Sequence, residues 1–257
     1  AATGRRSTSC CGRSSRRTAT ADVLLLHAGI ADRRMWRPQV EALEAAGHRT
    51  TAPDLPGYGD AQLEPGEVDY VGFAASLLEA PAAVVGCSFG GRVALELAAV
   101  HPGLVERLVL VAPGLGGWDW SEAAEALFAE EEELLDAGDL RGAAAQQARM
   151  WLGPDATDEV RALTEAMTLR SYEQQLPLEG AVHASWPQPP ALSRLEELDV
   201  PTLVVAGSED LDDVRAMCAL LGERLPDARI ETVAGAGHLP GLERPDELNR
   251  LLVDFLG

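Results

Sequence analysis

From residue 22 to its last residue, the chain alternates short apolar runs with amphipathic segments of helical length. The run from Val23 to Leu26 holds no polar side chain, which is typical of a strand buried on both faces. Strands that alternate with helices favour an α/β fold, in which helices cover both faces of a mostly parallel, twisted sheet. We predict strands over 23–26, 49–55, 82–86, 108–111, 202–206 and 229–233, and helices over 35–46, 70–79, 90–100 and 246–256.

One long stretch, 115–196, interrupts this alternation. Its apolar residues follow helical spacing over 121–137, 139–152 and 155–172, and it holds four of the five tryptophans of the chain. A helical insertion between two strands of an α/β sheet is typical of a cap over a site at the strand ends. We therefore predict a core formed by 21–114 and 197–257, with a helical cap over 115–196.

The first twenty residues differ in composition from the rest of the chain. They contain five arginines, no acidic residue, and no valine, leucine, isoleucine, methionine or aromatic residue. Such a segment has too little apolar surface to bury, so we predict an Arg-rich, mobile tail. It lacks the apolar stripe of a transit peptide and the apolar stretch of a secretory signal.

The charge balance excludes several classes of function. The 257-residue chain has 21 arginines, no lysine and 41 acidic residues, for a net charge of −20. Without lysine, neither a Schiff base nor a phosphate-binding P-loop can form, and the acidic surface disfavours nucleic acid and anionic membranes. The four scattered cysteines (Cys10, Cys11, Cys87 and Cys218) show no metal-binding spacing, and we predict no metal, no cofactor and a cytoplasmic location.

The segment Gly86-Cys87-Ser88-Phe89-Gly90 matches the motif G-x-S-x-G and lies between a predicted strand and a predicted helix. A nucleophile at this sharp turn stands at the top of the sheet, near the positive end of the helix dipole. The flanking glycines leave room for the strained turn. Ser88 is therefore the candidate nucleophile; Cys87 fits less well, because Val85 stands where its first glycine would be.

A serine hydroxyl needs a base to accept its proton, and the base needs a carboxylate to orient it. Of the five histidines, only His238 follows the last predicted strand, in a glycine-rich loop; His48, His101 and His183 fit surface or structural positions. Asp210 follows the preceding predicted strand and is the candidate carboxylate. Its neighbours Glu209, Asp212 and Asp213 are predicted to be solvated acids.

Acyl transfer by serine also requires donors for the developing oxyanion. The backbone N–H of Phe89, directly after the nucleophile, is one candidate donor. The second donor is expected in the loop after the first strand, from Gly29 or Ile30. Under the predicted cap, the candidate residues of the substrate pocket are His27, Trp118, Trp120, Met150 and Trp151.

Five motifs in one order give the chain, from about residue 22 to its end, a resemblance to the α/β-hydrolase superfamily. They are His27-Ala28-Gly29, Asp54-Leu55-Pro56-Gly57-Tyr58-Gly59, Gly86-Cys87-Ser88-Phe89-Gly90-Gly91, Gly207-Ser208-Glu209-Asp210 and Gly235-Ala236-Gly237-His238. The resemblance implies the α/β-hydrolase fold and a serine hydrolase of the small-ester, enol-lactone or cofactor-free haloperoxidase-like branches. The expected partner is a small, largely apolar ester or lactone. A C–C bond hydrolase or lyase, or a catalytically silent small-molecule receptor, remains the alternative.

Overall fold

The computed structural model describes residues 21–257. The predicted Arg-rich tail, 1–20, and with it Cys10 and Cys11, lies outside the described residues. No helix within 21–257 is long and apolar enough to cross a membrane.

Six parallel strands form the central sheet, in the order β2-β1-β4-β5-β7-β8. The prediction of a parallel α/β sheet is thus confirmed. Because all strands run the same way, the loops after β4, β7 and β8 meet at one edge of the sheet. The strands are β1 (Asp22–Leu26), β2 (Arg49–Thr51), β4 (Ala82–Cys87), β5 (Val105–Val111), β7 (Thr202–Gly207) and β8 (Ala228–Val233).

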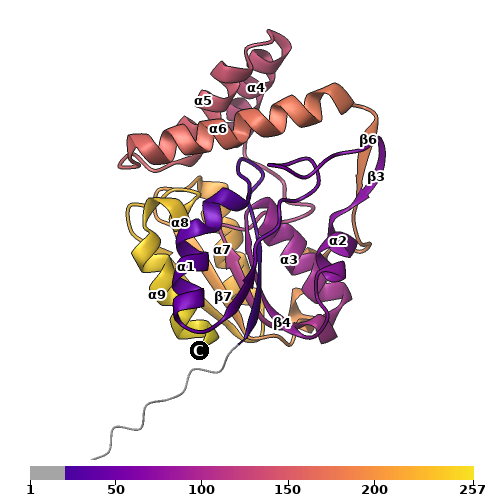
Figure 1. Ribbon diagram of the computed structural model, residues 1–257, viewed down its shortest axis with the longest axis vertical. Helices are drawn as coiled ribbons and strands as arrows, with labels where there is room; N and C mark the ends of the chain where they lie inside the picture. The colour runs from indigo at the N-terminus through magenta and orange to yellow at the C-terminus, as the bar shows by residue number, and fades with distance from the viewer. Residues whose placement is uncertain (1–20) are drawn as a thin grey trace, which may run out of the picture.

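Helices cover both faces of the sheet, as Figure 1 shows. Alternate residues of β1 divide between two apolar cores: Val23 and Leu25 pack on one face, Leu24 and Leu26 on the other. Helices α1 (Arg37–Ala45) and α9 (Pro245–Leu256) cover the first face, beside the short α8 (Pro240–Glu243). Helices α2 (Tyr70–Ser76), α3 (Phe89–Val100) and α7 (Asp212–Arg224) cover the second.

Three helices between β5 and β7 form a layer across the carboxyl edge of the sheet (Figure 1). They are α4 (Glu122–Asp136), α5 (Leu140–Trp151) and α6 (Asp158–Gln175). The chain then returns through β6 (Val182–Ser185), which pairs in parallel with β3 (Gly66–Asp69). The remaining elements are 3₁₀ helices, η1 (Arg33–Trp36), η2 (Pro102–Leu104), η3 (Leu176–Leu178) and η4 (Ala191–Glu197).

Several elements differ from the sequence prediction: β3, β6 and α8 were not predicted, and two further differences have a visible cause. The strand predicted over 49–55 ends at Thr51, because the chain then turns away from the sheet. After this turn, the Asp54 carboxylate accepts the backbone N–H groups of Arg33 and Asp60, at 2.8 and 2.9 Å. Pro53 has no N–H to offer a neighbouring strand. Helix α7 was not predicted, although Val214, Met217, Cys218 and Leu221 recur at helical spacing on its buried face.

Candidate active site

Ser88 occupies a sharp turn between β4 and α3. Its φ of 51° and ψ of −113° lie in a region that residues other than glycine rarely adopt, at a cost of about 1–3 kcal/mol. A Cβ at Gly86 would lie 2.3 Å from the Gly90 carbonyl oxygen, and one at Gly90 would lie 2.2 Å from the Leu26 carbonyl oxygen. Only glycine fits at these two positions, and together they hold the partly exposed Ser88 above the sheet.

The backbone around Ser88 is fixed on both sides. Its N–H donates to the Val111 carbonyl at 3.0 Å, and its own carbonyl accepts the N–H groups of Arg92 and Gly114 at 2.9 Å each. The neighbouring Cys87 is fully buried, and burial raises the pKa of its thiol well above the usual value. A buried, neutral thiol is a poor nucleophile, so the geometry favours Ser88 over Cys87.

His238 and Asp210 form a buried pair. His238 lies in the loop after β8 and Asp210 in the loop after β7, with exposed fractions of 2% and 6%. His238 Nδ1 lies 2.8 Å from Asp210 Oδ2, and Asp210 Oδ1 accepts the Leu211 N–H at 2.8 Å. Because the carboxylate accepts at Nδ1, that nitrogen carries the proton. His238 Nε2 is buried and has no hydrogen-bond partner among residues 21–257, so it is a free acceptor there.

The loop of His238 lies against the turn of Ser88, since the Cys87 sulfur donates to the His238 carbonyl oxygen at 3.7 Å. From the cap, the Trp151 indole lies over the imidazole, with ring centroids 4.1 Å apart. The Trp151 carbonyl accepts the His238 N–H at 2.7 Å, and its indole N–H donates to Gln147 Oε1 at 2.8 Å. The Trp151 indole thus covers one side of the buried imidazole.

Within residues 21–257, the backbone N–H groups of Phe89, Gly29 and Ile30 have no hydrogen-bond partner next to the sharp turn of Gly86–Gly90, which we call the elbow. A Cβ at Gly29 would lie 3.5 Å from the Cβ of Phe89, so this loop borders the start of α3. The loop is held there because the His27 carbonyl accepts the Gly90 N–H at 3.0 Å. The Ile30 carbonyl accepts the hydroxyl of Thr168, on α6, at 2.9 Å.

His27 is not a pocket residue, contrary to the sequence prediction. The side chain is fully buried, and its Nε2 accepts the Leu55 N–H at 2.9 Å. Nδ1 must then carry the proton, which it donates to the Ala28 carbonyl at 2.9 Å. Burial lowers the pKa of His27, so the ring stays neutral and supports the loop beside the elbow.

Asp213 was predicted to be solvated, and this prediction is wrong. Asp213 is 8% exposed, and its carboxylate accepts the Trp118 indole N–H at 3.1 Å. It also accepts the backbone N–H and hydroxyl of Ser121, at 3.0 and 2.7 Å. Trp118, predicted to line the pocket, thereby fixes the start of the cap to α7. These hydrogen bonds lower the pKa of Asp213.

The other predicted pocket residues lie toward His238. The ring of Trp120 meets that of Phe128 edge to face, at 5.1 Å, and Phe128 lies 6.3 Å from Trp151. Met150, directly before Trp151, is half-buried against the same apolar core.

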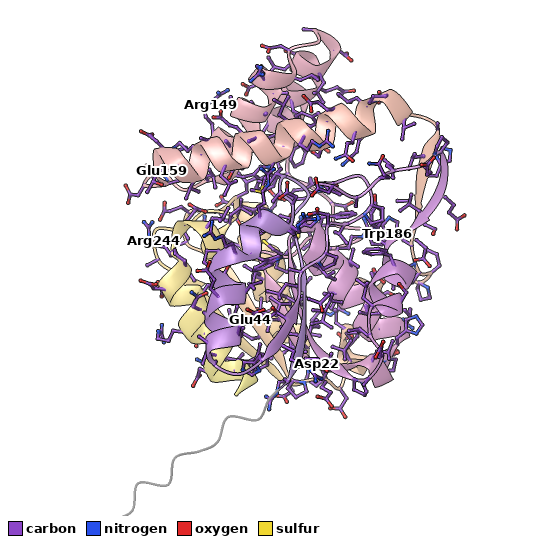
Figure 2. All side chains as sticks on the ribbon, viewed as in Figure 1. Asp22, Glu44, Arg149, Glu159, Trp186 and Arg244 are labelled. Atoms are coloured by element: carbon purple, nitrogen blue, oxygen red, sulfur yellow. The ribbon has the colours of Figure 1, made fainter. Side chains whose placement is uncertain are left out.

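A second aromatic group, which the sequence did not reveal, surrounds Phe89. Tyr70 and Trp186 lie 4.9 and 5.7 Å from its ring, both edge to face, and Tyr58 lies 6.0 Å away. Trp186 is labelled in Figure 2, below the cap on the side of α2 and α3. The guanidinium of Arg92 stacks on this indole at 3.5 Å. These residues come from distant segments, so only the presence of a tryptophan hinted at a role for position 186.

Known proteins resemble the chain over nearly its whole length. Pimeloyl-(acyl-carrier protein) methyl ester esterase of Neisseria meningitidis serogroup B is 31% identical over 255 residues, covering 95% of this chain and 96% of the relative. The enzyme of the same name from Aeromonas hydrophila is 29% identical over 246 residues, covering 92% and 95%. Among solved structures, a thermophilic esterase from Thermogutta terrifontis has a TM-score of 0.75 at 25% identity, covering 93% of this chain and 90% of that one.

The sequence pattern of the Alpha/beta hydrolase family matches residues 23–251, which include the elbow, the buried pair and the helical insertion. The parallel sheet with helices on both faces agrees with this match. The chain therefore belongs to the alpha/beta hydrolase family.

Proposed function

We propose that this protein is a serine hydrolase that cleaves a carboxylic ester or lactone of a small, largely apolar substrate. The observation that carries the proposal is the buried imidazole of His238, which has Asp210 on Nδ1 and an unoccupied acceptor at Nε2. The backbone of its loop contacts a strained elbow that presents a partly exposed Ser88. The similarity to named esterases supports an ester as the bond that is cleaved.

The reaction follows from this arrangement. Nε2 of His238 takes the proton of the Ser88 hydroxyl as its oxygen attacks the carbonyl carbon, and Asp210 stabilises the imidazolium. When the tetrahedral intermediate collapses, His238 returns the proton to the departing alkoxide oxygen, which leaves an acyl group on Ser88. Water deprotonated by His238 then attacks the acyl carbon, and the acid is released as Ser88 regains its proton.

The oxyanion of each tetrahedral intermediate needs donors that are not already used. The free N–H of Phe89, together with that of Gly29 or Ile30, supplies them from two sides of the elbow. Each such donor contributes about 3 kcal/mol to lowering the barrier.

Aromatic rings on both sides of the elbow indicate the chemistry of the substrate. Trp151 and Phe128 lie on the side of His238, whereas Trp186 packs on Phe89, the first residue of α3. Aromatic side chains favour contact with apolar or aromatic acyl and alcohol groups. The net charge of −20 opposes the approach of polyanionic substrates.

The test is labelling with a fluorophosphonate, followed by mass mapping, and turnover of p-nitrophenyl esters, methyl esters, lactones and 1,3-diketones. We expect label on Ser88 and preferred turnover of apolar esters or lactones. Ser88→Ala should lower kcat by at least about 10⁴-fold at a nearly unchanged melting temperature. The exposed Ser76 gives a matched control, since Ser76→Ala should keep full activity.

The outcomes separate the alternatives. Preferred cleavage of 1,3-diketones would assign a C–C bond hydrolase. Ligand-dependent stabilisation without turnover would assign a silent receptor. Full activity of Ser88→Ala would refute the nucleophile itself.

A further inference from the structure

Three consecutive backbone N–H groups around His238 are all bound. Gly237 donates to both carboxylate oxygens of Glu243, at 3.1 and 3.0 Å, and Leu239 donates to Glu243 Oε1 at 3.1 Å. The N–H between them, that of His238 itself, donates to the Trp151 carbonyl at 2.7 Å. One side chain therefore holds the N–H groups of the two residues that flank His238.

The same carboxylate also binds the cap. Glu243 Oε2 accepts the N–H of Gly153, two residues after Trp151, at 2.7 Å. The two backbones approach so closely that a Cβ at Gly237 would lie 2.5 Å from the Gly153 nitrogen. A Cβ at Gly153 would lie 2.9 Å from Glu243 Oε2. Glycine at both positions lets the carboxylate reach both chain segments.

No basic side chain neutralises this carboxylate within residues 21–257, although Glu243 is only 8% exposed. The adjacent Arg244 donates to the Glu243 backbone carbonyl at 2.9 Å and pairs with Asp155 at 3.7 Å. Figure 2 labels Arg244 at the junction of cap and core, below Glu159. A buried carboxylate must be compensated by hydrogen bonds, and here the compensation comes from the peptide groups of Gly153, Gly237 and Leu239.

We propose that Glu243 is a positioning residue that fixes the imidazole of His238 and joins its loop to the Trp151–Gly153 end of α5. The inference rests on the proposed function, because it assigns His238 the role of general base. Asp210 orients the imidazole ring from one end, whereas Glu243 and Trp151 hold the backbone that carries the ring. The end of α5 is thereby bonded to the loop that carries the imidazole.

This role can be separated from simple support of the fold. A displacement of about 1 Å in a reacting group can lower the rate by about 100-fold. Glu243 is buried, and its carboxylate accepts backbone N–H groups, so its replacement should change kcat and leave KM nearly constant. A residue that only stabilised the fold would lower the melting temperature, while the folded molecules kept the kcat of the wild type.

The variant Glu243→Gln tests the inference. Both carboxylate oxygens of Glu243 accept N–H groups, whereas a glutamine amide has one oxygen that accepts and an NH₂ group that would face an N–H donor. We expect kcat and the rate of fluorophosphonate labelling to fall by about 100-fold, with KM within about twofold. The downfield proton resonance of His238 Nδ1–H should shift or broaden. Asp246→Asn, at an exposed acid three residues along, should change none of these.

Folded Glu243→Gln that keeps kcat, the labelling rate and the downfield resonance of the wild type would overturn the inference. Amide hydrogen exchange of the wild type decides the question if the variant does not fold. The N–H groups of Gly153 and Leu239 should exchange equally slowly, since one carboxylate holds both. Exchange of Gly153 as fast as that of the exposed Gly117 would also overturn it. Absence of any label on wild-type Ser88 would instead refute the proposed function. The His238 Nδ1–H resonance and the amide exchange of Gly153 and Leu239 would still test the hydrogen bonds of Glu243.

Discussion

Replacing Asp210 by asparagine removes the acceptor that sets the tautomer of His238. The Asp210 carboxylate accepts from two donors, His238 Nδ1 and the Leu211 N–H, each at 2.8 Å. An amide can accept with only one of its two ends. If its oxygen stays on Leu211, its NH₂ group faces Nδ1, the proton moves to Nε2, and Ser88 loses its base.

The expected effect on catalysis is much larger than that on stability. Loss of the correct tautomer should lower kcat by about 10⁴-fold, which corresponds to about 5.4 kcal/mol of barrier. The lost charge-assisted hydrogen bond should lower the free energy of unfolding by about 1–3 kcal/mol. The assay is ester turnover at pH 7.5, well below the melting temperature, with urea unfolding measured on the same samples.

Asp212→Asn is the matched control. The Asp212 side chain is 90% exposed, and in the described part of the chain it pairs only with Arg215, a surface contact that contributes little. Its kcat should stay within about twofold of the wild type. The role of Asp210 is refuted if folded Asp210→Asn keeps more than about a tenth of the wild-type kcat, or if Asp212→Asn is the variant that loses activity.

Two further predictions concern stability. In Gly90→Ala, the new Cβ would lie 2.2 Å from the Leu26 carbonyl oxygen, so the free energy of unfolding should fall by about 3 kcal/mol in urea titration. Gly103→Ala, where a Cβ meets nothing within 4 Å, should change it by less than about 1 kcal/mol, and equal losses would contradict the steric argument. Burial lowers the pKa of His27 below 6.5 in the folded protein. In acid, the imidazole therefore binds a proton more readily in the unfolded chain than in the folded one, so this group makes folding less favourable as the pH falls below about 6.5. Melting temperatures from pH 8 to 5 should therefore fall less steeply in His27→Asn, and parallel curves would exclude His27 as a cause.

The parts of the fold that could be predicted are those whose signal is local. An uninterrupted apolar run such as 82–86 fits only a strand with both faces covered, and β4 occupies Ala82–Cys87. The strand predicted over 49–55 was too long because the contacts of Asp54 end it, and the contact with Arg33 joins residues about twenty positions apart. The pairing of β3 with β6 joins segments more than a hundred residues apart, and neither segment has a strong strand pattern.

In the candidate site, too, the residues that could be predicted are those with a local sequence signal. The glycine spacing around Ser88 is a local steric requirement, so the sequence displays it directly. Asp210 and His238 could be paired because parallel topology brings the loops after β7 and β8 together. The roles of Asp213 and Glu243 depend on cap residues about ninety positions away, and no local pattern distinguishes these acids from the solvated ones.

Asp213 and Glu243 also show how the cap is attached. Each is buried, and within residues 21–257 neither forms an ion pair with arginine; each is compensated by N–H or O–H donors of the cap. Asp213 holds the segment before α4, and Glu243 holds the segment after α5. The pair of helices α4 and α5 is therefore fixed to the core at both ends. Buried contacts of this kind are little screened by salt, unlike the exposed arginine pairs. Salt should therefore weaken the surface pairs well before it loosens the cap from His238.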